Sequence, residues 1–464
     1  MAAGHRALLE TAEPSFEKEK LFRHCMTLRG FSNLEEPRVF LAELFPHISK
    51  MEIRVRRIFV LSTAVAAVSF CQSAGAKTLE EVLKEKGVIT EADYKEVIKS
   101  RPVDYKLGKG FTFTNAEENF QLSLGGRMQF RYNYFDKDGG QDVSQWQPKR
   151  IKFYTSGYAY TKDLTYAFQA DFVNGSKATL LDDAYLNYRV QDAVQVRIGQ
   201  FKTPFVRQEI ISDGNLQLVD RSPVVDAFKH GRDNGAMLHG KLAGGYAAYN
   251  VGLFGGTGQS TVRTGNNGAF FTRIAVNPFG DLAYLEADMD NSSKPMLSIG
   301  SSYLNNTLKK SSATALTDVD ATSSSYFGKG WLGSGLAKFN ATEKIDVNAF
   351  GADVVFKWRG FSLQTEYLAA QADGKVSSKK LRAQGFYAQT GYFLIPGKLE
   401  AAMRYSYYDP DRDKSNNLLS EVGGGFSYYF DKHNLKVQTD LANIHQQPAL
   451  SDEIQFRVQA QITF

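Results

Sequence analysis

The chain has 464 residues, of which 43% are hydrophobic and 13% aromatic, and its formal net charge is +5. A balance this close to neutral argues against nucleic-acid binding as the main task, because such binding requires a concentrated basic patch. Apolar residues are plentiful but rarely continuous, which argues against membrane-spanning helices of about 20 apolar residues each.

Residues 51–76 are predicted to be a secretory signal peptide. Three arginines precede an apolar run at 59–70 that is too short to span a membrane as a helix, and small residues follow it up to Ala76. Residues 1–50 are predicted to be an extension created by a start codon assigned too early. The alternative is a real cytoplasmic or regulatory extension. Cleavage after Ala76 would remove both cysteines of the chain.

Residues 77–110 are predicted to form a short periplasmic helical segment. Apolar residues recur at helical spacing between Leu79 and Lys99, and Gly87 divides them into two short helices. Such a piece could form a small coiled-coil plug or a trimer handle. A solvated spacer with marginal helicity is the alternative, because each helix is short.

Residues 118–464 alternate between apolar and polar side chains with a period of two, which indicates β-strands with one dry and one wet face. The pattern is clearest at 120–134 and at 453–464, and the last run closes on the aromatic Phe464. The sixteen predicted strands lie near 120–134, 150–159, 164–172, 183–190, 193–200, 234–242, 247–254, 269–276, 295–303, 346–358, 361–369, 384–394, 398–408, 421–430, 434–442 and 453–464. The predicted fold class is therefore all-β, a 16-stranded antiparallel transmembrane β-barrel in contact with outer-membrane lipid.

The charged residues of these strands support this prediction. An arginine or lysine that faces lipid at the bilayer midplane costs about 2 to 4 kcal/mol. When the apolar parity of each strand is taken as outward, the charged side chains all point inward. The basic ones are Arg127, Arg131, Arg150, Lys152, Arg189, Arg197, Arg273, Lys357, Arg404, Lys436 and Arg457, and the acidic ones are Asp171, Asp183, Asp353, Glu366, Glu400, Asp440 and Glu453. A soluble β-sandwich would show a similar alternation, but the signal peptide and Phe464 favour the barrel.

The lengths of the connections give an independent indication. Connections after even strands are short, whereas those after odd strands are longer, notably 201–233 and 304–344. With both termini periplasmic, the long connections become extracellular loops. Residues 201–233 are expected to fold into the lumen and narrow it. The connection 277–294 is an exception, because it is long but falls on the predicted periplasmic side.

Three stretches around this loop carry a family resemblance. Residues 198–205, Asp220-Arg221-Ser222 and residues 231–235 resemble the phosphate-selective porin O and P family, as do Glu366-Tyr367 and residues 385–408. The resemblance implies a homotrimeric channel in the outer membrane of a Gram-negative cell. It also implies that small anions pass along inward arginines and lysines toward a basic constriction.

The resemblance carries over to particular basic residues. Lys149 and Arg150 resemble the paired basic residues that face the constriction, although Lys149 is not inward by parity. The predicted pore-lining and anion-binding residues are Arg127, Arg131, Lys149, Arg150, Lys152, Arg189, Arg197, Lys202, Arg207, Arg221 and Arg232. Fixed positive charge in a narrow pore raises the local concentration of anions, and guanidinium groups bind phosphate oxygens in paired geometry.

One difference from the pattern of this family weakens the assignment of phosphate as the solute. The loop 201–233 carries five basic and five acidic residues, so its net charge is zero. The predicted function is passive diffusion of small hydrophilic solutes through an outer-membrane porin that prefers phosphate or other inorganic anions. A general, weakly selective porin is the alternative.

Other classes of function are less well supported. A barrel-embedded enzyme would need Ser, His and a carboxylate together, and the scattered histidines offer no such set. A surface scaffold would use the Ser- and Thr-rich loop 304–344, but we expect this loop to be ordinary surface cover. No metal site, cofactor or nucleic-acid partner is expected.

Overall fold

The computed structural model describes residues 79–94, 103–106, 108, 110–173, 180–261, 263, 266–311, 316, 330–447 and 451–464. The predicted signal peptide and the residues before it lie outside this described part. Residues 1–88 and 89–464 form two separate compact units. No helix among the described residues is long and apolar enough to cross a membrane.

The described start of the chain is helical, as predicted. In the first unit, α4 (Leu79–Glu85) ends at a turn in which Gly87 has a φ of +67°. In the second unit, residues 91–94 are helical, and Thr90 and Asp93 cap them reciprocally at 2.9 and 3.2 Å.

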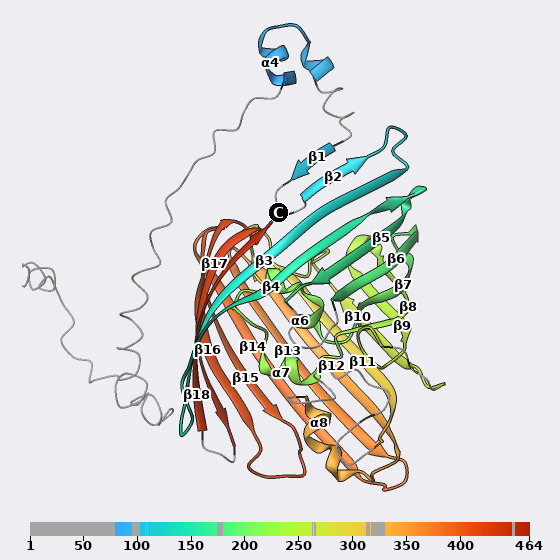
Figure 1. The fold of residues 1–464 in the computed structure, drawn as a ribbon, viewed down its shortest axis with the longest axis vertical. Coiled ribbons are helices and arrows are strands. Elements are labelled where there is room, and N and C mark those ends of the chain that lie inside the picture. The colour runs from blue at the N-terminus through green and yellow to red at the C-terminus, as the bar shows by residue number, and fades with distance from the viewer. Residues whose placement is uncertain are drawn as a thin grey trace, which may run out of the picture. The chain divides into compact units, whose positions relative to one another are not determined.

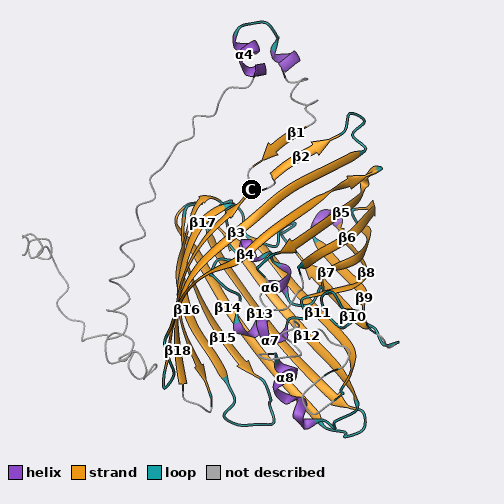
Figure 2. Ribbon diagram, viewed as in Figure 1, coloured by secondary structure: helices purple, strands orange, loops and turns teal. Residues whose placement is uncertain are grey.

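The described residues then form eighteen strands, and Figure 2 shows how few of the residues are helical. The strands are β1 (Val103–Lys106), β2 (Gly110–Thr114), β3 (Phe120–Lys137), β4 (Val143–Ala159), β5 (Thr161–Asp171), β6 (Leu181–Gln191), β7 (Val194–Lys202), β8 (Arg232–Leu242), β9 (Ala247–Phe254), β10 (Ala269–Val276), β11 (Met296–Lys309), β12 (Lys344–Trp358), β13 (Phe361–Gly374), β14 (Lys380–Ile395), β15 (Leu399–Asp409), β16 (Leu419–Asp431), β17 (Leu435–Gln446) and β18 (Ser451–Thr463). The helices are α6 (Arg207–Ile210), η2 (Asp213–Asn215), α7 (Pro223–Phe228), η3 (Ala243–Gly245), α8 (Trp331–Gly335) and η4 (Leu336–Lys338).

The strands β3 to β18 close into a barrel (Figure 1). Each pairs antiparallel with the next, and β18 returns to pair with β3 from Glu453 opposite Lys137 to Thr463 opposite Arg127. The backbone of Phe464 completes the closure through hydrogen bonds of 2.7 and 3.0 Å with Gly126. Each of the sixteen predicted strands overlaps one of these strands, so the predicted 16-stranded antiparallel barrel is confirmed.

Two short strands were not predicted. β2 pairs with residues 121–124 of β3, and β1 pairs with β2. The prediction that residues 77–110 are helical is therefore wrong for 103–106 and for Gly110. The start of β3 extends beyond the last residue of β18, and β2 covers this edge, which would otherwise carry unpaired backbone groups.

The two faces of the barrel wall have the predicted chemistry. Large apolar side chains lie exposed on the outside, for example Leu186, Ile198 and Met403, which are 57%, 59% and 62% exposed. The predicted inward charges are mostly buried, for example Glu366 and Arg404 at 1% and 3% exposed. The outer surface therefore suits a bilayer, where lipid contacts the apolar side chains.

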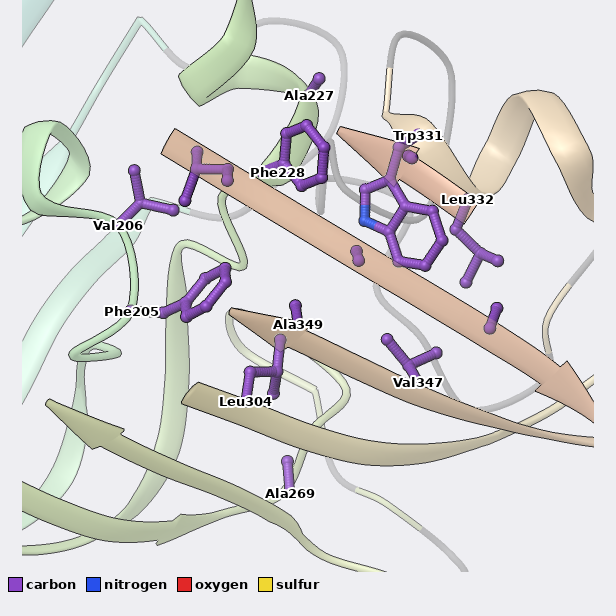
Figure 3. Packing of buried hydrophobic residues seen from close by; sticks show 14 of the residues in the cluster. Phe205, Val206, Ala227, Phe228, Ala269, Leu304, Trp331, Leu332, Val347 and Ala349 are labelled. Carbon is purple, nitrogen blue, oxygen red and sulfur yellow. The ribbon is translucent and has the colours of Figure 1, made fainter. Parts of the chain in front are cut away.

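Part of the lumen is filled by a hydrophobic core rather than by water. Phe205 and Val206 precede α6, Phe228 ends α7, and all three belong to one buried cluster with residues of α8 (Figure 3). The same cluster includes inward apolar residues of the wall, namely Leu304, Leu308, Ile345, Val347, Ala349, Leu368, Ala370, Leu381 and Ala383. The prediction that the inner face of every strand contacts water is therefore wrong for β11 to β14 at their long-loop ends.

The connection 304–344 contributes to this core. Trp331 is 2% exposed, Leu332 is fully buried, and the Trp331 ring stacks on Phe228 with centroids 6.3 Å apart. The prediction that this connection is surface cover is wrong for Trp331 to Phe339, because these apolar side chains turn into the barrel.

Replacing Trp331 with alanine is expected to lower the free energy of unfolding by about 3 to 5 kcal/mol, because it leaves a cavity in a packed core. The matched control is Trp146→Ala on the outward face of β4, where the side chain is 76% exposed, and it should change stability by less than about 0.5 kcal/mol. Thermal unfolding of both variants in the same detergent measures the difference. Equal shifts would show that the inner core does not stabilise the barrel.

Candidate permeation pathway

The loop between β7 and β8 crosses the lumen, as predicted. Figure 1 shows α6 and α7 of this loop inside the ring of strands. The loop is fixed to the far wall by hydrogen bonds that reach three strands. The backbone N–H of Arg207 donates to Glu366 of β13 at 2.6 Å, and that of Val219 donates to Asp440 of β17 at 3.0 Å. The side chain of Gln217 donates to Glu400 of β15 at 2.5 Å.

Local sequence explains the start of α7. Pro223 occupies its first turn, where no backbone N–H is needed, and the Ser222 side chain accepts a hydrogen bond from the N–H of Val224 at 3.2 Å. The Ser222 hydroxyl also lies 2.9 Å from that of Ser406 on β15. The capping residue therefore anchors the helix to the wall as well.

The long connection 277–294 braces the same loop. Glu286 is 1% exposed and accepts hydrogen bonds of 2.7 Å from the side chain of Gln208 and from the N–H of Gln217. It also accepts one of 2.9 Å from Gln389 on β14. The connection 277–294 is therefore longer than the other connections on its side of the barrel because it folds into the lumen and packs against the loop.

Three cavities remain between the loop and the wall. The outer vestibule, of about 620 Å³, lies on the long-loop side, and Lys149, Asp220, Arg221 and Asp226 are among its lining residues. The constriction cavity, of about 220 Å³, shares Arg221 with it. The inner cavity, of about 490 Å³, lies toward the short turns and shares four lining residues with the constriction cavity. These shared residues are Lys152, Lys202, Asp213 and Arg232.

The constriction cavity is lined by six basic and four acidic residues, a formal excess of two basic side chains. The basic residues are Arg150, Lys152, Lys202, Arg221, Lys229 and Arg232, and the acidic ones are Asp171, Asp182, Glu209 and Asp213. The sequence placed most of these basic residues at the constriction but could not show how closely the carboxylates accompany them.

Asp213 holds three of the predicted basic residues together. Its carboxylate lies 2.5 Å from Arg127, 2.7 Å from Arg150 and 2.8 Å from Lys152. The next residue has no side chain, and a β-carbon on Gly214 would lie 2.4 Å from Cζ of Arg127. The glycine thus makes room for the guanidinium that pairs with Asp213.

The other basic residues of the constriction are also engaged. Lys152 pairs with Asp182 at 2.8 Å, and Arg232 donates to Asp183 at 2.9 Å. Arg221 lies 3.2 Å from Glu209. Lys202 donates instead to two backbone carbonyls of the loop, at 2.5 and 3.1 Å, and no ion pair with a carboxylate of a described residue is found for it.

Two carboxylates of the loop, those of Asp213 and Glu209, are ionised at neutral pH. Burial raises the pKa of Asp213, but Lys152, Arg150 and Arg127 outweigh it and hold that pKa well below its usual range. Burial likewise raises the pKa of Glu209, but Arg221 and other nearby cations lower it to about 2. Because this folded-state pKa is depressed, the stabilisation from Glu209 is fully present above the unfolded value of about 4.3 and is lost as the pH falls toward 2.

Lys149 faces the pore through a β-bulge. Gln129 of β3 pairs with Arg150, and Phe130 pairs with Pro148, so Lys149 is the extra residue between them. A bulge re-aims side chains, and Lys149 lines the outer vestibule although strand parity pointed it outward. Pro148 was the available signal, because proline within a strand marks an edge or a bulge.

Six of the eleven predicted site residues do not line the constriction cavity, and three of these have other contacts. Arg131 is 2% exposed and is bound to Asp220 at 2.5 Å, so it anchors the loop. Arg207 is 1% exposed and lies beside Asp353 of β12, on the filled side of the lumen. Arg189 pairs with Asp163 at an exposed rim and lines none of the three cavities. Arg189 therefore lies apart from the basic residues that line these cavities.

Arg197 lines the inner cavity together with Lys202 and Arg232. The sequence also missed Lys229, which lines the constriction cavity from the loop just before β8. Its position within the predicted loop was the only signal for it.

Comparisons with known proteins agree with this architecture. The family described as phosphate-selective porin O and P matches residues 122–461. A protein of Aquifex aeolicus that has no assigned function is 26% identical over 426 residues, which cover 82% of this chain and 93% of that protein. Porin O of Pseudomonas aeruginosa is 21% identical over 408 residues and covers 82% of each chain.

Among solved structures, the chain resembles an anion-selective porin from Comamonas acidovorans. The TM-score is 0.51 at 12% identity, over 74% of this chain and all of that porin. At this identity the likeness supports the fold alone.

Proposed function

Because this chain belongs to the phosphate-selective porin O and P family of outer-membrane channels, we propose that it lets small hydrophilic anions diffuse passively through the three connected cavities. The observation that carries the proposal is the constriction cavity, where six basic residues face four acidic ones. An excess of basic side chains in the smallest of the three cavities raises the local concentration of anions and repels cations.

The residues have separate roles in this proposal. Lys149 attracts anions into the outer vestibule, since no ion pair with it is found among the described residues, and Arg150 and Lys152 receive them at the constriction. Lys202 and Arg232 line both the constriction and the inner cavity and so connect the two. Arg127 acts through Asp213, which it holds in place, and Arg131 acts through Asp220.

The preference for anions is expected to be weak, because carboxylates pair with most of the basic side chains at the constriction. Phosphate and other inorganic anions are the proposed solutes, and a general porin is the runner-up. We also propose that the channel is a homotrimer and has no enzymatic activity.

Planar-bilayer recordings under a salt gradient test this function. The reversal potential of the unaltered channel should show a preference for chloride over potassium, and Arg150→Ala should reduce it several-fold, because it removes one of the six basic side chains that line the constriction cavity. Lys432→Ala is the matched control, since Lys432 is 65% exposed at a turn and pairs with Asp290.

A cation preference in the unaltered channel would overturn the anion assignment. If Arg150→Ala keeps the chloride preference of the unaltered channel, Arg150 does not contribute to anion selectivity at the constriction. Block of chloride current by low concentrations of phosphate would favour a phosphate site over the general porin.

A further inference from the structure

The inner cavity differs in chemistry from the constriction above it. Its wall combines basic residues with a set of large apolar side chains that the constriction cavity lacks. These apolar residues are Tyr185, Phe201, Pro204, Ile210, Met237 and Tyr284. They come from the wall, from the loop 203–231 and from the brace 277–294. A simple inorganic anion makes no use of such surface.

Arg197 of β7 gives this cavity a cation that is not neutralised. Its guanidinium lies 4.4 Å from the ring centre of Tyr185 and 5.5 Å from that of Phe201. No carboxylate of a described residue forms an ion pair with it, and its Nε is buried without a hydrogen-bond acceptor. By contrast, Arg232 in the same cavity is engaged by Asp183 at 2.9 Å.

The polar side chains next to Arg197 do not supply a counter-charge. Asn187 is the cross-strand partner of Arg197, and its side-chain oxygen lies 2.7 Å from Nε2 of His239. The amide of Asn187 donates to Gln195 at 3.1 Å. These residues satisfy one another, and none of them supplies the guanidinium of Arg197 with a negative charge.

The geometry points to a binding subsite for aromatic carboxylates in the inner cavity, and this inference rests on the proposed anion function. The carboxylate would pair with the guanidinium of Arg197 through two parallel hydrogen bonds. The ring would lie against the apolar side chains that line the cavity, such as Met237 and Tyr284. A volume of about 490 Å³ is within the range of small-molecule sites, roughly 300 to 1,000 Å³.

Block of the chloride current tests the subsite, with three probes added on the short-turn side. Benzoate carries a carboxylate and a ring, cyclohexanecarboxylate carries a non-planar ring, and acetate carries no ring. We expect benzoate to reduce the current at concentrations about tenfold lower than acetate, with cyclohexanecarboxylate between them. Arg197→Gln should abolish the difference, and Arg197→Lys should leave part of it, because lysine keeps the charge without the planar fork.

The control is Arg382→Gln on the outward face of β14, where the side chain is 46% exposed, and it should bind benzoate like the unaltered channel. Equal block by benzoate and acetate in a channel that still prefers chloride would overturn the subsite alone. Full benzoate block in Arg197→Gln would also overturn it. If the unaltered channel shows no preference for chloride, the proposed function is overturned instead. Failure of the subsite and failure of the proposed function are therefore distinguishable.

Discussion

Replacing Asp213 with asparagine is expected to raise the anion selectivity of the channel about five-fold. Asp213 is the shared partner of Arg127, Arg150 and Lys152, at 2.5 to 2.8 Å. Asparagine has nearly the same shape and can still accept a hydrogen bond, but it removes one negative charge from the constriction. A unit charge about 4 Å from the path of an ion is worth about 1 kcal/mol even in water, which is roughly a five-fold change in local concentration.

The measurement is the reversal potential under a salt gradient. Asp163→Asn is the matched control, because Asp163 pairs with Arg189 at 2.8 Å where both side chains are 47% exposed, and solvent screens it. The control should keep the selectivity of the unaltered channel. If Asp213→Asn leaves the selectivity unchanged or shifts it toward cations, the carboxylate at residue 213 does not limit the anion preference.

Replacing Asp220 with alanine is expected to loosen the loop 203–231 and to destabilise the protein by about 3 kcal/mol. Asp220 pairs with Arg131 at 2.5 Å and with Arg457 at 3.3 Å, and its backbone oxygen accepts from Arg404 at 2.8 Å. Removing one partner of a buried ion pair costs about 3 to 5 kcal/mol, because it leaves charge uncompensated. The lower value applies here because the Asp220 side chain is 26% exposed and because Arg457 keeps its pair with Asp440 at 2.7 Å.

Thermal unfolding in detergent and single-channel recording measure the two effects. The variant should unfold at lower temperature, and its open current should be larger and noisier, because the loop no longer holds one position. Asp226→Ala is the matched control in the same loop, since Asp226 is 45% exposed and its ion pair among the described residues is with nearby Lys229. A quiet channel of normal conductance would show that Asp220 does not anchor the loop.

The sequence alone was sufficient to predict the strands of the barrel wall. Every strand has neighbours that pair along its length, so alternation of apolar and polar side chains reflects lipid on one side and protein interior on the other. The same alternation could not show what fills the interior. Val347, Leu368 and Leu381 point inward and are almost fully buried, because parts of two distant loops cover them.

The candidate site was only partly predictable, for a similar reason. Parity placed Arg150 and Lys152 on the inner face, and the loop 201–233 was correctly expected to enter the lumen. The pairing of Asp213 with Arg127 joins residues that are 86 positions apart, and no local pattern encodes it. The balance of five basic and five acidic residues in the loop was the one available hint that most cations would be paired.

The most direct test of the account is whether anions pass along one side of the loop 203–231 only. Residues 77–464 contain no cysteine, so a single cysteine can be placed on each side and treated with a negatively charged thiol reagent during recording. Ser212→Cys lines the inner cavity, whereas Ser427→Cys lies where β16 meets the loop, because Ser427 is 2% exposed and donates to the backbone oxygen of Gln217 at 2.7 Å. We expect stepwise loss of current for Ser212→Cys and no change for Ser427→Cys. Rapid modification of Ser427→Cys with loss of current, together with an inert Ser212→Cys, would contradict the account.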